Sequence, residues 1–138
     1  MEHFEALIAV RVYDVIHAIL TVFPSLSGAE LYEKFDLDRA LHSRRIRGKV
    51  SLSKGYSITV SEKYLYRNYK LVTLYNYSFL NDRGEFILTY DNSPHYPDLV
   101  NFPHHKHLHP KDIHPPLSFS GELIDALREI GWMISNPL

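Results

Sequence analysis

The spacing of the apolar residues changes near residue 44, and this change constrains the fold more than any other feature of the sequence. Between residues 4 and 23, apolar residues recur every three or four positions, which predicts an amphipathic helix that ends before Pro24. From residue 46 to residue 90, apolar residues alternate with polar ones, as in strands that bury one face. Turn signals separate four such strands: Lys54-Gly55, Arg67-Asn68 and Asn81-Asp82-Arg83-Gly84. The sequence therefore predicts a four-stranded antiparallel meander after the helix.

Two further helices and one long loop complete the prediction. Residues 29–35 follow Ser27-Gly28 and indicate a short second helix, and residues 121–130 indicate a C-terminal helix that begins at Ser118 or Ser120. Residues 94–116 contain six of the eight prolines, so we expect a long His- and Pro-rich loop without regular structure. The layout is α+β, with helices packed on a sheet, and 138 residues suit a single domain over residues 1–138.

The apolar N-terminal segment is not expected to enter a membrane. Arg11, Asp14 and His17 interrupt residues 4–23, whereas a spanning helix needs about 20 mostly apolar residues. The chain starts with Met1-Glu2-His3 rather than with the basic segment of a signal peptide. The sequence contains no cysteine, which fits a reducing compartment and excludes thiol nucleophiles and cysteine-ligated metals. We therefore expect a cytoplasmic protein.

Charge is distributed unevenly along the chain. The whole sequence carries a net charge of −1, but residues 39–70 carry nine basic side chains and one acidic side chain, a net +8. Such a block is typical of a surface that binds a phosphate backbone, and the alternative is that these are solvated faces of strands. The candidates for nucleic-acid binding are Arg44, Arg45, Arg47 and Lys49, with Tyr75 and Tyr77 as platforms on which unpaired bases stack. Core packing is the alternative role of the tyrosines.

Glu62 is out of place in its predicted strand. Alternation puts this carboxylate on the apolar face, where burial is costly unless the group is hydrogen-bonded or paired with a charge. Tyr75 and Tyr77 in the next strand could donate to it, and burial would raise the pKa of Glu62 and suit it to proton transfer. The alternative is that Glu62 points into water.

Histidines gather after the last predicted strand. Asp91 precedes a turn that leads to His95, so the carboxylate could orient this imidazole or could cap the turn. Four more histidines and a lysine follow within six residues: His104, His105, Lys106, His107 and His109. Because cysteine is absent, imidazole, carboxylate and phenol are the groups available for chemistry.

Three interpretations of this cluster stay open. In the first, the histidines act as general acids and bases without a metal, while the neighbouring lysine and arginines hold phosphate. In the second, two or three of His104, His105 and His107, together with Asp91, Glu62 or a more distant histidine, bind a divalent metal such as zinc, although their spacing matches no standard zinc framework. In the third, the loop is solvated and carries no chemistry.

The same residues carry a family resemblance. The stretch Phe86–Pro97, which contains YDNSPH, and the run FPHHKH over residues 102–107 resemble the YDNxPH…FPHHKH pattern of the TumE family. These are small toxins of bacterial and archaeal toxin–antitoxin pairs. The resemblance covers about residues 44–130, and it includes Arg47-Gly48-Lys49-Val50, Glu62, and Tyr75 with Tyr77. Ser93 and Tyr96 depart from the pattern, since the family commonly has Ala and a second His there.

The resemblance implies a growth-inhibiting toxin held in check by a neighbouring antitoxin, often one with a helix-turn-helix domain. The order of the elements is also similar to that of RelE-like ribonucleases. The leading hypothesis is a metal-independent ribonuclease that acts on cellular RNA through its His, Lys, Glu and Asp side chains. One alternative is a metal-dependent nuclease or other hydrolase at the same histidines, and another is a non-enzymatic RNA- or protein-binding module. Whether the chain forms oligomers stays open.

Overall fold

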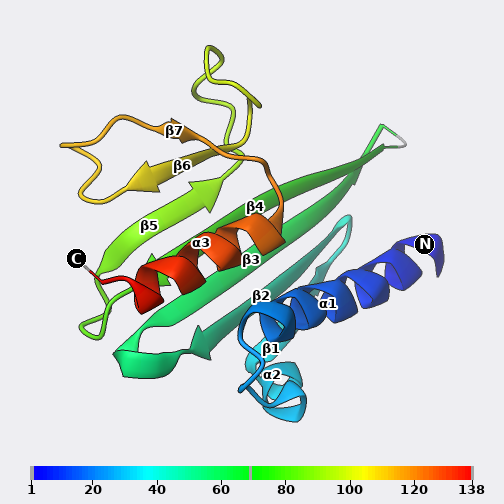
Figure 1. Cartoon of the computed structure of the whole chain (residues 1–138). Helices are drawn as coiled ribbons and strands as arrows, with labels where there is room; N and C mark the ends of the chain where they lie inside the picture. The colour runs from blue at the N-terminus through cyan, green and yellow to red at the C-terminus, as the bar shows by residue number, and fades with distance from the viewer. Residues whose placement is uncertain (1, 69, 138) are drawn as a thin grey trace.

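The computed structural model describes residues 2–68 and 70–137, and its strands form one antiparallel sheet. The strand order is β1–β2–β3–β4–β5–β6–β7, so each strand pairs with its neighbour in sequence (Figure 1). The strands are β1 (Phe35–Ala40), β2 (Ser43–Ser51), β3 (Ser57–Arg67), β4 (Lys70–Leu80), β5 (Phe86–Asp91), β6 (His105–Leu108) and β7 (Leu117–Ser118). The helices are α1 (Glu2–Val22), α2 (Gly28–Lys34) and α3 (Leu123–Ser135).

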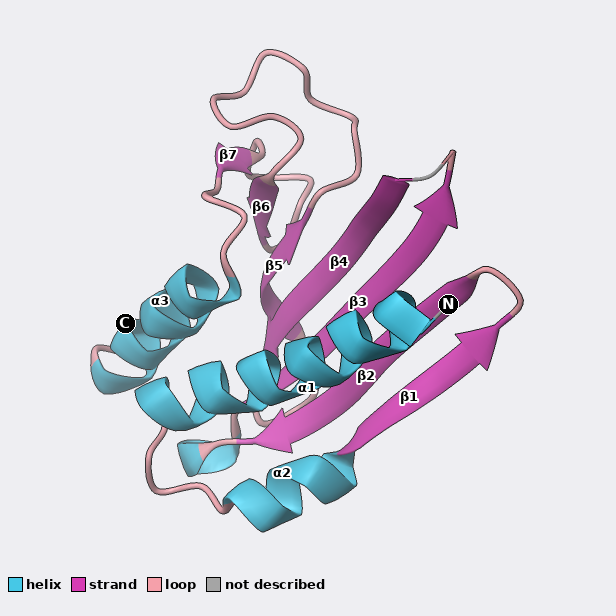
Figure 2. Ribbon diagram, turned by 90° about the vertical axis from the view of Figure 1, so that its right-hand side faces the viewer, coloured by secondary structure: helices cyan, strands magenta, loops and turns pink. Residues whose placement is uncertain are grey.

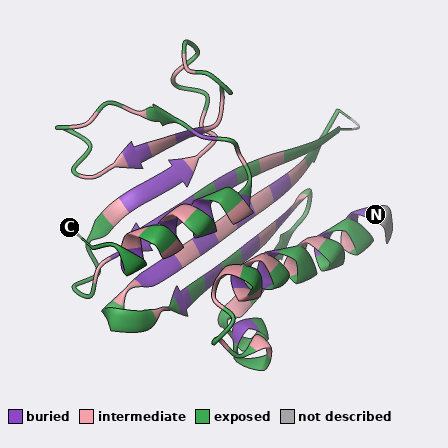
Figure 3. Ribbon diagram, viewed as in Figure 1, coloured by how far each residue is buried: buried purple, intermediate pink, exposed green. Residues whose placement is uncertain are grey.

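The core lies between the sheet and two helices. Figures 1 and 2 show α1 and α3 on the same face of the sheet, and Figure 3 shows that their outward sides are exposed. Val15 and Ile19 of α1 and Leu127 and Ile130 of α3 are completely buried in one cluster with residues of β2 to β5. Burial of each such side chain contributes roughly 1.5–3 kcal/mol, so this packing fixes which face of the sheet is covered.

The opposite face of the sheet carries many polar side chains, and we call it the open face. Two rows of side chains cross it from strand to strand, because residues opposite one another in a ladder point to the same side. The first row is Arg47, Ser61, Asn76, Asp91 and His105, and the second is Lys49, Thr59, Ser78, Thr89 and His107. A sheet that packs helices on one face leaves the other face free for polar groups.

The sheet has seven strands, so the prediction of a four-stranded meander is wrong in number. The four expected strands correspond to β2–β5, while β1 precedes them and β6 and β7 follow. β6 lies within residues 94–116, which were expected to form a loop without regular structure. Tyr69, which directly follows the predicted turn at Arg67-Asn68, lies outside the described residues.

The helices agree with the expected layout except at the two ends of α3, which begins at Leu123 and extends to Ser135, five residues past the predicted end. Ser118 and Ser120 do not cap this helix, because its N-cap is Glu122. The Ser120 hydroxyl instead accepts from the backbone N–H of Glu122 and donates to Asp125. Within the described part of the chain, no helix combines the length and the apolar character that a membrane span requires. The α+β class is confirmed, and the cytoplasmic location stays a prediction.

Candidate functional site

Three side chains converge on the open face where β5 and β6 pair. Asp91 ends β5 directly opposite His105 of β6, and His107 follows two residues later on the same side of the strand. Asp91 Oδ1 lies 3.0 Å from His105 Nε2, and Asp91 Oδ2 lies 3.7 Å from His107 Nε2. One ligand atom from each side chain lies within 4.8 Å of the others. We call Asp91, His105 and His107 the Asp–His centre.

Hydrogen-bond acceptors face both nitrogens of His105. Its Nδ1 lies 2.9 Å from the carbonyl oxygen of Pro103, and its Nε2 faces the Asp91 carboxylate. A carbonyl oxygen can only accept, so Nδ1 carries a hydrogen and donates it. The ring is only 2% exposed, which means that water cannot satisfy Nε2 in place of Asp91. A proton or another cation must therefore stand between Nε2 and the carboxylate.

A segment of the loop after β5 covers the two imidazoles. The ring of Tyr96 packs edge-on against His105 at 5.0 Å and against His107 at 5.8 Å between ring centroids. Burial and the nearby Lys111 lower the pKa of His107, although the Asp91 carboxylate opposes this shift. His95 is exposed and its ring stands edge-on to Tyr96, so the structure places it beside the Asp–His centre rather than in it.

A basic groove adjoins the Asp–His centre on the open face. It encloses about 650 Å³, and its lining includes three cationic side chains, Lys34, Arg47 and Lys49, with one carboxylate, Asp36. Asn76 also lines the groove and pairs directly across the ladder with Asp91. Arg47 and Asp91 stand three strands apart in one row, a span of about 14 Å at the usual strand spacing.

Glu62 is held in a buried ion pair on the helix-covered face. Arg11 of α1 donates to both of its carboxylate oxygens at 2.7 Å, and the hydroxyls of Tyr64 and Tyr77 donate to it as well. Burial opposes ionisation, but the hydrogen bonds and the charge of Arg11 outweigh it and lower the pKa of Glu62. The expectation of a raised pKa is therefore wrong, because the sequence did not reveal Arg11 as a partner.

Three other candidates also lie on the helix-covered face. The His104 ring stacks on Tyr75, and its Nδ1 lies 2.8 Å from the Tyr75 hydroxyl. Lys106 Nζ forms an ion pair with Glu129 of α3 at 2.8 Å. Arg44 forms an ion pair with Glu5 of α1 and is buried. The predicted cluster thus divides into two groups on opposite sides of the sheet.

The aromatic platforms predicted for base stacking are part of the core. Tyr75 is 7% exposed and Tyr77 is 2% exposed, and their rings stack on each other with centroids 4.7 Å apart. Neither ring presents a face to solvent on which a base could stack, so that prediction is wrong. Among the predicted arginines and lysine, Arg47 and Lys49 line the groove and Arg45 shares their side of β2.

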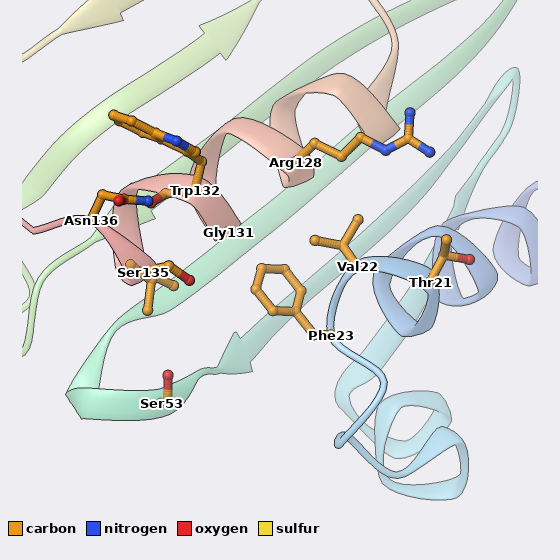
Figure 4. A pocket seen from close by; sticks show the side chains of 10 residues that line it. Thr21, Val22, Phe23, Ser53, Arg128, Gly131, Trp132, Ser135 and Asn136 are labelled. Carbon is orange, nitrogen blue, oxygen red and sulfur yellow. The ribbon is translucent and has the colours of Figure 1, made fainter.

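A second hollow lies where the end of α1 meets α3, and it encloses about 550 Å³ (Figure 4). Its described lining contains one charged side chain, Arg128, which Figure 4 shows at its upper edge. A charge without an acid or base beside it cannot transfer protons in a reaction. We therefore place the candidate site at the Asp–His centre.

Sequence reasoning missed two residues that shape these sites, Arg11 and Tyr96. The sequence did contain a signal for the pairing of Arg11 with Glu62. Arg11 is a cation on the apolar face of the first helix, and Glu62 is a lone carboxylate on the apolar face of a strand. Tyr96 stands where the TumE pattern commonly has histidine, and its ring covers the imidazoles of His105 and His107.

Comparisons with known proteins agree with the resemblance seen in the motif. A family model described as "Toxin TumE" matches residues 19–133. No curated protein and no solved structure gives a significant match. The similarity to RelE-like ribonucleases therefore stays a prediction.

Proposed function

The chain belongs to the TumE toxin family, and we propose that it acts as a toxin by cleaving RNA on the open face of its sheet. A toxin role follows from the family itself. The match covers residues 19–133, which include every residue of the Asp–His centre and of the basic groove. The partner that we expect is an antitoxin, which in this proposal carries a helix-turn-helix domain.

One observation carries the proposal of RNA cleavage, namely that both rows of the open face run from cations of the basic groove to the Asp–His centre. The groove presents three cations against one carboxylate, which favours a polyanion over a neutral substrate. The Asp–His centre supplies two imidazoles and a carboxylate, which are groups that move protons or activate water at a phosphodiester. An RNA strand held by its phosphates in the groove would extend past Asn76, which lines the groove and pairs with Asp91, toward the Asp–His centre.

The remaining sequence candidates have supporting roles in this proposal. Glu62 fixes α1 on β3 through Arg11, and Lys106 fixes β6 under α3 through Glu129. His104 packs on the core through Tyr75. These contacts hold β6 in register, so that its other side keeps His105 and His107 beside Asp91.

Induced expression in bacteria tests the proposal, with growth and the integrity of total RNA as readouts. We expect the wild-type chain to arrest growth and to degrade RNA. Asp91→Asn should abolish both effects, because the amide keeps the shape of the carboxylate but loses its charge. Asp98→Asn is the matched control: Asp98 is an exposed carboxylate in the loop that follows β5, and its variant should behave as wild type.

A non-enzymatic binding module would give a different result. In that case Asp91→Asn would still arrest growth, and RNA would stay intact in both strains. The double variant Arg47→Gln/Lys49→Gln would then relieve toxicity on its own, because both cations line the groove. That combination of results would contradict the proposed cleavage and would favour toxicity through binding alone.

A further inference from the structure

We propose that Asp91, His105 and His107 form a binding site for one divalent transition-metal ion. Metal bonds to imidazole nitrogen and carboxylate oxygen are about 2.0–2.2 Å long, which places two neighbouring ligand atoms of one ion roughly 3–3.5 Å apart. The Asp91 oxygens lie 3.0 Å and 3.7 Å from the two imidazole nitrogens, close to that range. The three side chains come from paired strands, so their backbones are already held in place.

The hydrogen bonds of His105 favour a metal over an empty polar cluster. Its Nδ1–H donates to the Pro103 carbonyl oxygen, and its buried Nε2 faces the Asp91 carboxylate. Metal-binding histidines almost always donate their second ring N–H to a carbonyl, a carboxylate or water, because this fixes the ring and its tautomer. A metal ion between Nε2 and Oδ1 would bond to both atoms and balance the charge of the carboxylate.

The second imidazole distinguishes a metal from a simple ion pair. His107 Nε2 approaches the other oxygen of Asp91 at 3.7 Å, which is too long for a hydrogen bond. The two imidazole rings stand nearly perpendicular, at 88°, with centroids 4.8 Å apart. An ion pair would need only one imidazole beside the carboxylate, whereas a metal site uses both.

The ligand types narrow the choice of metal. Two imidazoles and one carboxylate suit zinc, manganese, iron(II) and cobalt, whereas calcium and magnesium prefer sites made entirely of oxygen. Three protein ligands leave at least one position for water, which is the arrangement of catalytic rather than structural sites. Asp91 is the most exposed of the three ligands, at 13%, so solvent reaches the centre on the side of the carboxylate.

The binding of the metal is argued from the geometry alone, whereas its role in RNA cleavage rests on the proposed function. A bound metal lowers the pKa of its water and supplies hydroxide near neutral pH. The hydroxide oxygen would form a bond to phosphorus, the bond from phosphorus to the leaving sugar oxygen would break, and that oxygen would take a proton from water. The products would be a linear phosphate monoester and a free hydroxyl.

Titration of the full-length protein, purified without a histidine tag and stripped with chelator, tests the site. The probes are Zn²⁺ followed by calorimetry and Co²⁺ followed by visible absorption. We expect one equivalent to bind and binding at least about 100-fold weaker in Asp91→Asn, His105→Gln and His107→Gln. His42→Gln changes an exposed histidine in the turn between β1 and β2 and should bind as wild type. Circular dichroism shows whether each variant folds, and Asp91→Asn, which changes the most exposed ligand, keeps the test valid if a histidine variant does not.

Two results would overturn the metal site: no stoichiometric binding by the wild-type protein, or equal binding by the wild type and the folded ligand variants. RNA products test the role of the ion separately. Linear phosphate ends support water activation, whereas 2′,3′-cyclic phosphate ends, or cleavage undiminished by chelator, would refute it. If metal binds as expected and RNA is not cut at all, the proposed function fails while the metal site stands.

Discussion

Removal of two cations from the basic groove should change how strongly salt weakens RNA binding. The perturbation is Arg47→Gln combined with Lys49→Gln, in a background of Asp91→Asn so that the RNA is not cut. Arg47 is 59% exposed and pairs with Asp38, which is 58% exposed, so this ion pair is weak and gives way to a phosphate. The double variant therefore removes two contacts without disturbing the core.

The magnitude follows from the number of cations in the groove. Three line it, and each phosphate neutralised on a single strand contributes about 0.7 to the slope of log K against log salt. We expect a slope of about −2 before the double substitution and about −0.7 after it. From about 50 to 200 mM salt, affinity should fall about 18-fold with the groove intact and about 3-fold in the double variant.

Fluorescence anisotropy of a labelled RNA oligonucleotide over this range of salt measures both slopes. The control is Arg83→Gln in the same background, because Arg83 is an exposed cation paired with Glu85 in the turn between β4 and β5. Its slope should equal that of the intact groove. If the double variant keeps the slope of the intact groove, or if Arg83→Gln lowers it equally, the groove is not where RNA binds.

Three further substitutions test the structural roles on the helix-covered face. Glu62→Gln should destabilise the fold at pH 7 by about 2–3 kcal/mol in denaturant unfolding, less than for a fully buried pair because Arg11 is 34% exposed. Since folding lowers the pKa of Glu62, this stabilisation is present above the unfolded-state pKa and is lost as the pH falls through the folded-state pKa. The difference in unfolding free energy between wild type and Glu62→Gln should therefore shrink in acid, and a difference that stays constant would contradict the argument. Gly121→Ala should lower the melting temperature, because Gly121 has φ +92° and a Cβ there would lie 2.7 Å from His104 Nδ1; an unchanged melting temperature would show that His104 moves aside freely. Lys106→Gln should lower stability while RNA cleavage continues, and loss of cleavage in a folded variant would place Lys106 in the reaction after all.

Much of the fold could be predicted because apolar spacing reports local structure directly. The periodic positions of α1, such as Val15 and Ile19, are the buried ones, and Val60 in β3 is buried as its alternation required. β6 gave no such signal, because its residues are His105, Lys106, His107 and Leu108. Its histidines are buried by Tyr96 and by pairing with β5, and contacts between segments distant in sequence leave no local period.

The chemical groups of the candidate site could be predicted, but not their division between two faces. Alternation along an extended strand separates His104 and Lys106 from His105 and His107, and this separation becomes visible only once β6 is known to be a strand. Glu62 was recognised as unusual in its strand, but its partner lies 51 residues earlier, on α1. A pairing of that range depends on how the helix packs.

RNA cleavage by the purified His107→Gln and His104→Gln variants tests the central claim most directly, because the two histidines lie on opposite faces of the sheet. If the reaction takes place on the open face, His107→Gln should lose at least about 100-fold in rate. His104→Gln, with circular dichroism confirming its fold, should cleave at the wild-type rate. Loss of cleavage in His104→Gln with cleavage retained in His107→Gln would contradict the account and move the reaction to the helix-covered face.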